Sequence, residues 1–240
     1  MAFNRPDARQ LSGVDRMVGG SILRLTQMRV VTMHERAVRG LEEPARHRRR
    51  ASELMTKWDA DTAEWYAANY GDYATNRLAV EALELERDSV IVDVGCGTGS
   101  ALRHAASAAT HGRLIGVDPV PRMIEIAQEE TVGHPAERRI EFRPGSAEDL
   151  PVDDAAADVV FAFDSFDHWQ DKDRGLEEIH RILRPTGRLV VVKDESIPGA
   201  GEARQAFVDA LARTGFAVSR EERVNGEGVR FTLWICQAAD

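Results

Sequence analysis

The chain has 240 residues, 43% of them hydrophobic, and a formal net charge of −9. This length suits one α/β domain with an appendage, and no apolar run approaches the roughly 18 residues that a membrane span requires. The negative charge argues against a nucleic-acid partner, because an acidic body repels phosphates.

The first 54 residues predict an Arg-rich N-terminal extension, separate from a domain over residues 55–240. Residues 1–50 carry 11 arginines and 5 acidic residues, while the remainder is strongly acidic. Apolar residues recur at helical spacing between Val14 and Met28. Three interpretations stay open: a poorly packed or disordered extension, a helical contact with a partner or second copy, and an organelle-targeting peptide. The acidic residues disfavour the last, because such peptides are poor in acids.

Residues 58–85 predict one or two helices, broken at Gly71 and beginning near Asp61 as a possible N-cap. Aromatic residues gather here, at Trp58, Trp65, Tyr66 and Tyr70. The simplest interpretation is that these rings cover one edge of a sheet.

Residues 90–99, Val-Ile-Val-Asp-Val-Gly-Cys-Gly-Thr-Gly, predict a buried strand followed by a glycine turn and a helix from Ser100. This arrangement brings a ligand close to bare backbone at a helix N-terminus. A dinucleotide fingerprint needs glycines at relative positions 1, 3 and 6, whereas Gly95, Gly97 and Gly99 fall at 1, 3 and 5. The nearby Asp93 would repel a pyrophosphate but suits a ligand that carries an ammonium group.

The stretch from Asp93 to Gly99 resembles the first motif of the class I S-adenosylmethionine-dependent methyltransferases. The resemblance covers residues 58–240 and implies a Rossmann-like, doubly wound, mostly parallel seven-stranded sheet. It also implies a C-terminal antiparallel hairpin and an N-terminal helical lid over the cofactor. In such a lid Tyr66, Tyr70 and Tyr73 could face the sulfonium by cation–π contact, and Arg77 could pair with the methionine carboxylate.

Later segments extend the resemblance at matching distances. Residues 113–118 predict a second strand that ends in Asp118, whose carboxylate could bind both ribose hydroxyls or simply cap the helix that follows near Pro121. Met123 corresponds to the position that packs on the adenine. The loop after the third strand resembles the adenine loop, in which the Ala147 amide and the Glu148 side chain address the ring edge.

The fourth strand, residues 157–163, should lie beside the first at the topological switch point, so residues 162–169 should border the ligand crevice. A helix near 172–183, a fifth strand over 189–193, a helix over 202–213 and strands over 216–224 and 229–236 follow. Residues 225–228, Asn-Gly-Glu-Gly, predict the turn between the last two strands, with Asn-Gly as a strong hairpin signal. The Asn-Pro-Pro-Tyr type of sequence that marks methylation of adenine or glutamine amino groups is missing from the chain.

The sequence thus predicts methyl transfer from S-adenosylmethionine to a small-molecule acceptor, of the kind resembling quinone-biosynthesis and natural-product enzymes. His168 is the candidate general base, with a structural loop histidine as its alternative. The predicted cofactor residues are Asp93, Gly95, Gly97, Gly99, Asp118, Met123, Ala147, Glu148, Ala162, Tyr66 and Arg77. No metal is expected, since Asp164 and Asp167 alone are weak grounds for a Mg²⁺ site.

Two other functions stay open, a nicotinamide-dependent oxidoreductase and a non-catalytic S-adenosylmethionine-binding module. The two cysteines, Cys96 and Cys236, have no metal-ligand spacing, so a reducing cytoplasm is the expected compartment. The acceptor and the oligomeric state stay open.

Overall fold

The structure is a computed structural model that describes residues 58–195 and 200–239. The chain divides into two units, Met1–Glu42 and Glu43–Asp240, and every described residue belongs to the second. The predicted extension over residues 1–54 lies outside the described residues and stays a prediction.

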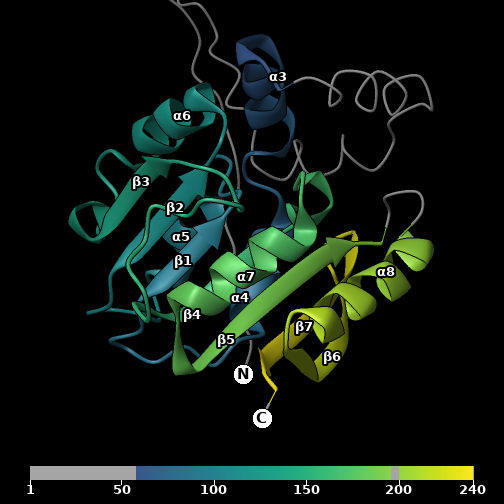
Figure 1. Cartoon of the computed structure of the whole chain (residues 1–240). Helices are drawn as coiled ribbons and strands as arrows, with labels where there is room; N and C mark the ends of the chain where they lie inside the picture. The colour runs from purple at the N-terminus through teal and green to yellow at the C-terminus, as the bar shows by residue number, and fades with distance from the viewer. Residues whose placement is uncertain (1–57, 196–199, 240) are drawn as a thin grey trace, which may run out of the picture. The chain divides into compact units, whose positions relative to one another are not determined.

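A single seven-stranded sheet forms the centre of the described domain, in the order β3-β2-β1-β4-β5-β7-β6 (Figure 1). The first five strands in this order are parallel, and β7 is antiparallel to both of its neighbours. The mostly parallel sheet with a C-terminal antiparallel pair is therefore confirmed. The strands are β1 (Ile91–Val94), β2 (Leu114–Asp118), β3 (Ile140–Pro144), β4 (Ala157–Phe163), β5 (Leu183–Asp194), β6 (Phe216–Gly226) and β7 (Val229–Ala238).

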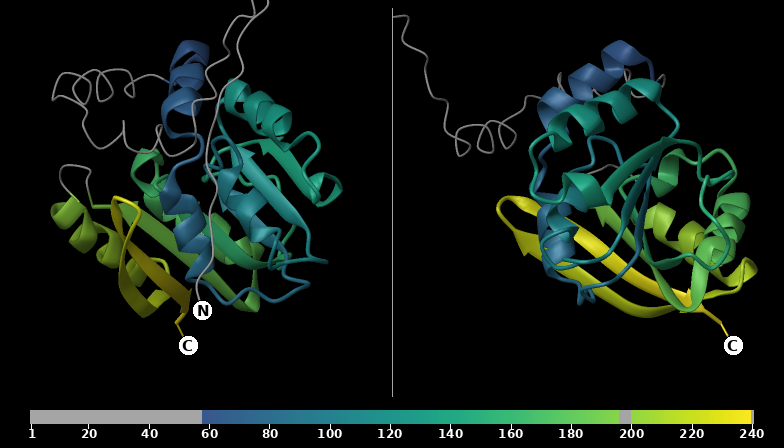
Figure 2. Two further views of the ribbon diagram at one scale, coloured as in Figure 1. Left: turned by 180° about the vertical axis from the view of Figure 1, so that it is seen from behind. Right: turned by 90° about the vertical axis from the view of Figure 1, so that its left-hand side faces the viewer.

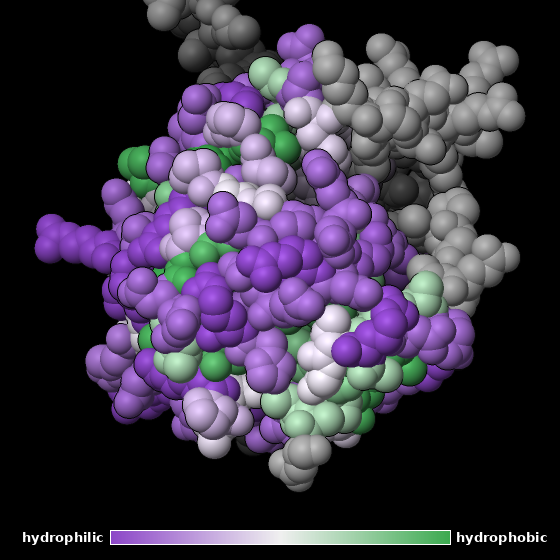
Figure 3. Space-filling view, viewed as in Figure 1, coloured by the Kyte–Doolittle hydropathy of each residue, from purple (hydrophilic) through white to green (hydrophobic). Residues whose placement is uncertain are grey.

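Helices cover both faces of this sheet, as the doubly wound prediction requires. One buried apolar cluster joins one face to α4 (Ala74–Glu81), α5 (Ser100–Ala105) and α6 (Pro121–Thr131). A second cluster joins the opposite face to α7 (Lys172–Ile182) and α8 (Ala200–Arg213). The outer side of the layer that carries α7 is mainly polar (Figure 3), and no helix of the described residues is long and apolar enough to cross a membrane.

The central strands are buried on both sides because their sequences are almost wholly aliphatic. All residues of β1 and β2 are buried, and Val92 and Val94 point to one cluster while Ile91 points to the other. A strand buried on both faces has a continuous apolar sequence, which is the pattern that predicted a strand over residues 90–94. Asp93 is therefore a carboxyl group in the middle of the core.

Two helices precede the sheet, α3 (Ala60–Tyr70) and α4, and they are separated at Gly71 as predicted. The N-cap of α3 is Asp59 and not Asp61, since the Asp59 carboxylate accepts a hydrogen bond from the Thr62 N–H at 3.0 Å. Asp61 instead lies in the first turn, where an acid also favours the helix dipole. Helix α3 lies against α6 (Figure 2), and α4 lies against α5 and β7.

The C-terminal hairpin turns within residues 225–228, where the sequence predicted it. Gly226 pairs with Val229, so the two-residue turn is Glu227-Gly228, and both residues have positive φ, 48° and 80°. Two successive positive φ values are typical of the type I′ turn, whose twist matches a hairpin. Asn225 and Gly226, the first half of the predicted turn, still pair within β6.

Candidate cofactor-binding site

The glycine turn between β1 and α5 is built on left-handed backbone. Gly95, Gly97 and Gly99 have φ of 78°, 51° and 77°, values that L-residues with a Cβ rarely adopt. A Cβ on Gly95 would lie 2.5 Å from the Ser165 Cβ, and a Cβ on Gly99 would lie 2.6 Å from the Phe142 ring. A Cβ on Gly97 would meet only the Tyr66 ring, at 3.9 Å. Gly97 is thus the glycine that leaves space for a ligand, whereas Gly95 and Gly99 allow close packing of the turn.

Asp93 is an acid with an unsatisfied oxygen at the base of this turn. Its residue is 2% exposed, and among the described residues no group donates a hydrogen bond to its buried Oδ1. Burial, with a smaller effect from the Asp118 charge, raises the pKa of Asp93 to about 8. A buried carboxylate without a partner is costly, so this position favours a ligand that brings a cation to it.

Asp118 ends β2, as predicted, and its carboxylate connects two neighbouring segments. Oδ2 accepts from the Gly97 N–H at 3.0 Å and Oδ1 from the Val120 N–H at 2.9 Å. Burial raises the pKa of Asp118, while these two hydrogen bonds oppose that shift. The carboxylate therefore both caps the turn before α6 and holds the glycine turn, and each oxygen keeps a second lone pair for a ligand.

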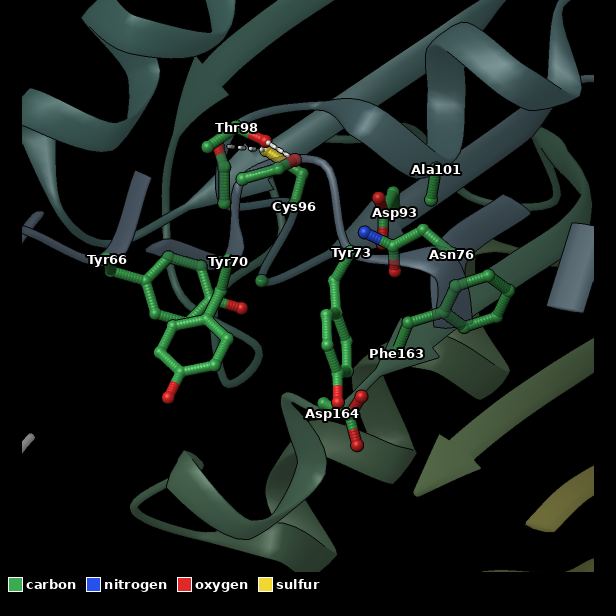
Figure 4. A pocket seen from close by; sticks show the side chains of 13 residues that line it. Tyr66, Tyr70, Tyr73, Asn76, Asp93, Cys96, Thr98, Ala101, Phe163 and Asp164 are labelled. Atoms are coloured by element: carbon green, nitrogen blue, oxygen red, sulfur yellow. Dashed lines mark hydrogen bonds between the residues drawn. The ribbon is translucent and has the colours of Figure 1, made fainter. Parts of the chain in front are cut away.

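Tyrosines from the preceding helices cover the pocket (Figure 4). Tyr66, Tyr70 and Tyr73 line it together with Asp93 and Gly97. Tyr70 lies 5.6 Å from Tyr66 and 5.9 Å from Tyr73 between ring centroids, so the three rings form a connected wall. The three tyrosines thus line the pocket from the covering segment, and their contact with a sulfonium stays a prediction.

Several pocket residues were missed or underused by the sequence-based prediction. Asn76, Thr98, Phe163 and Asp164 also line the pocket. The Thr98 hydroxyl donates to the Gly71 carbonyl at 2.8 Å and so ties the glycine turn to the break between the two covering helices. The one sequence signal for Asp164 was an acid directly after a buried strand at the switch point.

Seven of the eleven predicted cofactor residues do not line the pocket, and Asp118, Arg77, Ala162 and Gly99 are four of them. Arg77 pairs with Glu81 at 2.6 Å and with Glu227 of the hairpin turn at 2.5 Å, and it does not line the pocket. Ala162 is fully buried in the core on the opposite face of the sheet, because alternate residues of β4 face opposite ways. Gly99 faces Phe142, as described above.

Three residues assigned to the adenine lie in buried or hydrogen-bonded positions. Met123 is 1% exposed and packs with Ala63 and Val120 between α6 and α3. Ala147 is 5% exposed in the core near α7. Glu148 Oε1 accepts from the N–H groups of residues 170 and 171 at 2.7 Å and 3.0 Å, so one of its oxygens is already engaged. None of the three lines the pocket, and their adenine roles stay predictions.

The predicted base His168 lies exposed in the 3-10 helix η2 (Phe166–His168), outside the pocket lining. Its ring meets Trp58 edge-on, with 5.9 Å between centroids. Partial burial of the ring, the largest effect, lowers the pKa of His168. Residues 58–195 and 200–239 contain no group of three or more His, Cys, Asp or Glu side chains arranged for a metal ion.

These features define an α/β domain with a ligand site at the carboxyl ends of β1 and β4, where the strand order reverses. S-Adenosylmethionine fits the donor set here. An unpartnered buried oxygen of Asp93 suits its ammonium group, the space beside Gly97 suits the approach of its amino-acid tail, and the ring wall suits a sulfonium.

Comparison with known proteins identifies the domain. Residues 92–191 match the family model of the methyltransferase domain. O-methyltransferase rstn1 of Aspergillus nomiae is 36% identical over 124 residues, which are 50% of this chain and 54% of that protein. Demethylmenaquinone methyltransferase of Chlorobaculum tepidum is 33% identical over 125 residues, 52% of this chain and 49% of that protein. The chain thus spans about half the length of these curated relatives.

A solved structure shows the same fold. The SAM-dependent methyltransferase from Aquifex aeolicus superposes with a TM-score of 0.61 at 19% identity, over 75% of this chain and 99% of that one. Residues 92–191 therefore match the methyltransferase domain in sequence, and the described domain has the fold of a solved SAM-dependent methyltransferase.

Proposed function

We propose that the protein transfers a methyl group from S-adenosylmethionine to a hydroxyl group of a small molecule. The observation that carries the cofactor assignment is the unpartnered, buried Oδ1 of Asp93 beside the open side of Gly97. An ammonium group satisfies this oxygen, whereas the pyrophosphate of a nicotinamide dinucleotide would meet a like charge.

Different residues of the chain would bind different parts of the cofactor. Asp93 would hold the ammonium group, Asp118 the ribose hydroxyls and the wall of tyrosines the sulfonium. The cofactor supplies a methyl carbon already activated by positive sulfur. The protein therefore contributes mainly alignment of the acceptor and exclusion of water, for which the covering helices α3 and α4 are placed.

The relatives support the acceptor class. One is named an O-methyltransferase and another a demethylmenaquinone methyltransferase, which agrees with a small acceptor and with the quinone-biosynthesis resemblance. The acidic charge of the chain and the two aspartates in the pocket lining argue against phosphate-rich acceptors, nucleic acids included. Two free, buried cysteines, Cys96 and Cys236, support a reducing compartment such as the cytoplasm.

Calorimetry and product analysis test the proposal in sequence. Binding of S-adenosylhomocysteine to the full chain, with no binding of NADH, is expected. Incubation with S-adenosylmethionine and a panel of phenols, hydroquinones and amines should then release S-adenosylhomocysteine with a hydroxyl acceptor. Binding without turnover across the panel would favour a non-catalytic binding module, and the absence of any binding would refute the assignment.

A further inference from the structure

Asp164 is a pocket carboxylate to which the proposed function assigns no part of the cofactor. It directly follows β4, its φ is 52°, and it lines the pocket together with Asp93 and Gly95. Its backbone N–H donates to the Val192 carbonyl at 2.9 Å, which fixes this conformation. A non-glycine residue held at positive φ in a binding pocket is a feature that clusters at functional sites.

The two oxygens of this carboxylate have different surroundings. Oδ1 accepts from the Asp194 N–H at 2.7 Å. Among the residues that the structure describes, none donates a hydrogen bond to Oδ2. Burial raises the pKa of Asp164 to about 7, opposed by the hydrogen bond from the Asp194 backbone. The carboxyl group can therefore exist in either protonation state near neutral pH.

The charged groups that face Asp164 come from three neighbouring elements. On β5, the Asp194 charge raises and the Lys193 charge lowers the pKa of Asp164, and on η2 the Asp167 charge raises it. Lys193 is itself paired with the Asp167 carboxylate. Asp93 of β1 shares the pocket lining with Asp164.

The tyrosines of the covering segment remain protonated beside Asp164. Burial and the nearby Asp194 raise the pKa of Tyr73 to about 12, and burial raises the pKa of Tyr66 further. Figure 4 shows the Tyr73 hydroxyl directed toward Asp164. Its hydroxyl hydrogen bonds to Asp194, so Tyr73 is a positioning group and not a competing base.

We propose that Asp164 is the general base of the reaction, accepting the hydroxyl proton of an uncharged acceptor at its free Oδ2. The proposal rests on the proposed function. The acceptor oxygen forms a bond to the methyl carbon while the carbon–sulfur bond breaks and its electron pair stays on sulfur. The hydroxyl proton passes to Asp164 and is later released to water.

The same pocket sets the charge of the acceptor. Its lining contains the two carboxyl groups of Asp93 and Asp164, and no Lys, Arg or His among the described lining residues. The cofactor ammonium would neutralise Asp93, so Asp164 is left to meet the acceptor. A carboxylate or phosphate acceptor would meet like charge there, whereas a neutral hydroxyl donates a hydrogen bond.

Asp164→Asn is the sharpest test, because asparagine tolerates positive φ and can still accept from the Asp194 N–H. Two readouts need no turnover. Calorimetry should show S-adenosylhomocysteine affinity within threefold of the unchanged protein. Carbon NMR of labelled aspartate carboxyls in that complex should show a group titrating near pH 7 that is missing from Asp164→Asn. With catechol and hydroquinone as acceptors, the kcat of the variant should fall at least a hundredfold. Its pH profile should also lose the change in kcat near pH 7.

The matched controls are Asp173→Asn, an exposed aspartate paired with Arg213, and His168→Gln, the base that the sequence predicted. Two results would overturn the proposal. In the first, the carboxyl signal that is missing from Asp164→Asn does not titrate above pH 6 in the unchanged protein. In the second, His168→Gln loses more activity than Asp164→Asn. A tenfold loss of S-adenosylhomocysteine affinity in Asp164→Asn would also overturn it, by making Asp164 a cofactor residue. Failure of the unchanged protein to bind S-adenosylhomocysteine would instead refute the proposed function.

Discussion

Replacement of Asp93 by asparagine should stabilise the free protein at alkaline pH and weaken cofactor binding. The pKa of Asp93 is about 8 in the folded protein, against 3.8 for an unperturbed aspartate. The folded state therefore holds a proton that the unfolded state has released, and stability falls as pH rises from about 4 to about 8. A difference of this size corresponds to at most roughly 6 kcal/mol, at about 1.4 kcal/mol for each pKa unit.

Asparagine removes this penalty but keeps a buried polar group without a partner, which costs on the order of 1–3 kcal/mol. We therefore expect Asp93→Asn to be about 3 kcal/mol or more above the unchanged protein in stability at pH 8 and no more stable at pH 5. Urea unfolding followed by tryptophan fluorescence, without cofactor, measures both. Calorimetry at pH 8 should show S-adenosylhomocysteine affinity lower by tenfold or more, because the ammonium loses its charged partner.

Asp173→Asn serves as the control of opposite sign. A hydrogen bond from Arg213 lowers the pKa of Asp173, so its contribution to stability is present above pH 4 and is lost as pH falls. Its removal should slightly reduce stability at pH 8 and leave S-adenosylhomocysteine binding unchanged. The reasoning fails if Asp93→Asn is less stable than the unchanged protein at pH 8, or if it binds S-adenosylhomocysteine equally well.

Three further substitutions follow from the site. Asp118→Ala should weaken S-adenosylhomocysteine binding by roughly 1–3 kcal/mol, because it removes the acceptor of two N–H groups and the group proposed to hold the ribose hydroxyls. Unchanged affinity by calorimetry would exclude Asp118 from the site. In urea unfolding, Gly95→Ala should lower the free energy of unfolding several times more than Gly133→Ala does. Both glycines have positive φ, but only a Cβ on Gly95 would meet a neighbour, at 2.5 Å. Equal losses of stability would contradict this. Arg77→Ala should leave S-adenosylhomocysteine affinity within twofold of the unchanged protein. A tenfold loss would instead support the pairing with the cofactor carboxylate that the sequence predicted.

The architecture was predictable because it follows from patterns that repeat along the chain. Aliphatic runs marked the buried parallel strands, and the glycine turn marked where a ligand meets the sheet. The burial of Asp93 was predictable for the same reason, because a residue within a strand that is buried on both faces is itself buried. The hairpin and its turn within residues 225–228 were also predicted, but Asn225 and Gly226 still pair within β6 and only Glu227 and Gly228 form the turn.

Side-chain partners were less predictable than backbone placement. Arg77 lies on the helix that covers the pocket, yet two glutamates, one of them 150 residues later in the hairpin turn, draw its guanidinium away. Ala162 and Phe163 are adjacent in β4, so their side chains point to opposite faces of the sheet. Long-range ion pairs and the facing of a single residue are set by tertiary packing, which local sequence does not encode.

Four neighbouring parallel strands each carry an aspartate at or just past the carboxyl end, Asp118, Asp93, Asp164 and Asp194 in sheet order. What separates the first three is the number of backbone N–H groups that each carboxylate receives. Asp118 accepts two, Asp164 accepts one, and no described residue donates to the buried Oδ1 of Asp93. Backbone donors stabilise the ionised form, and the two that Asp118 receives oppose the rise in its pKa that burial causes. Asp93 depends on a cation for the same stabilisation, and Asp164 lies between the two, which is the condition a proton acceptor needs.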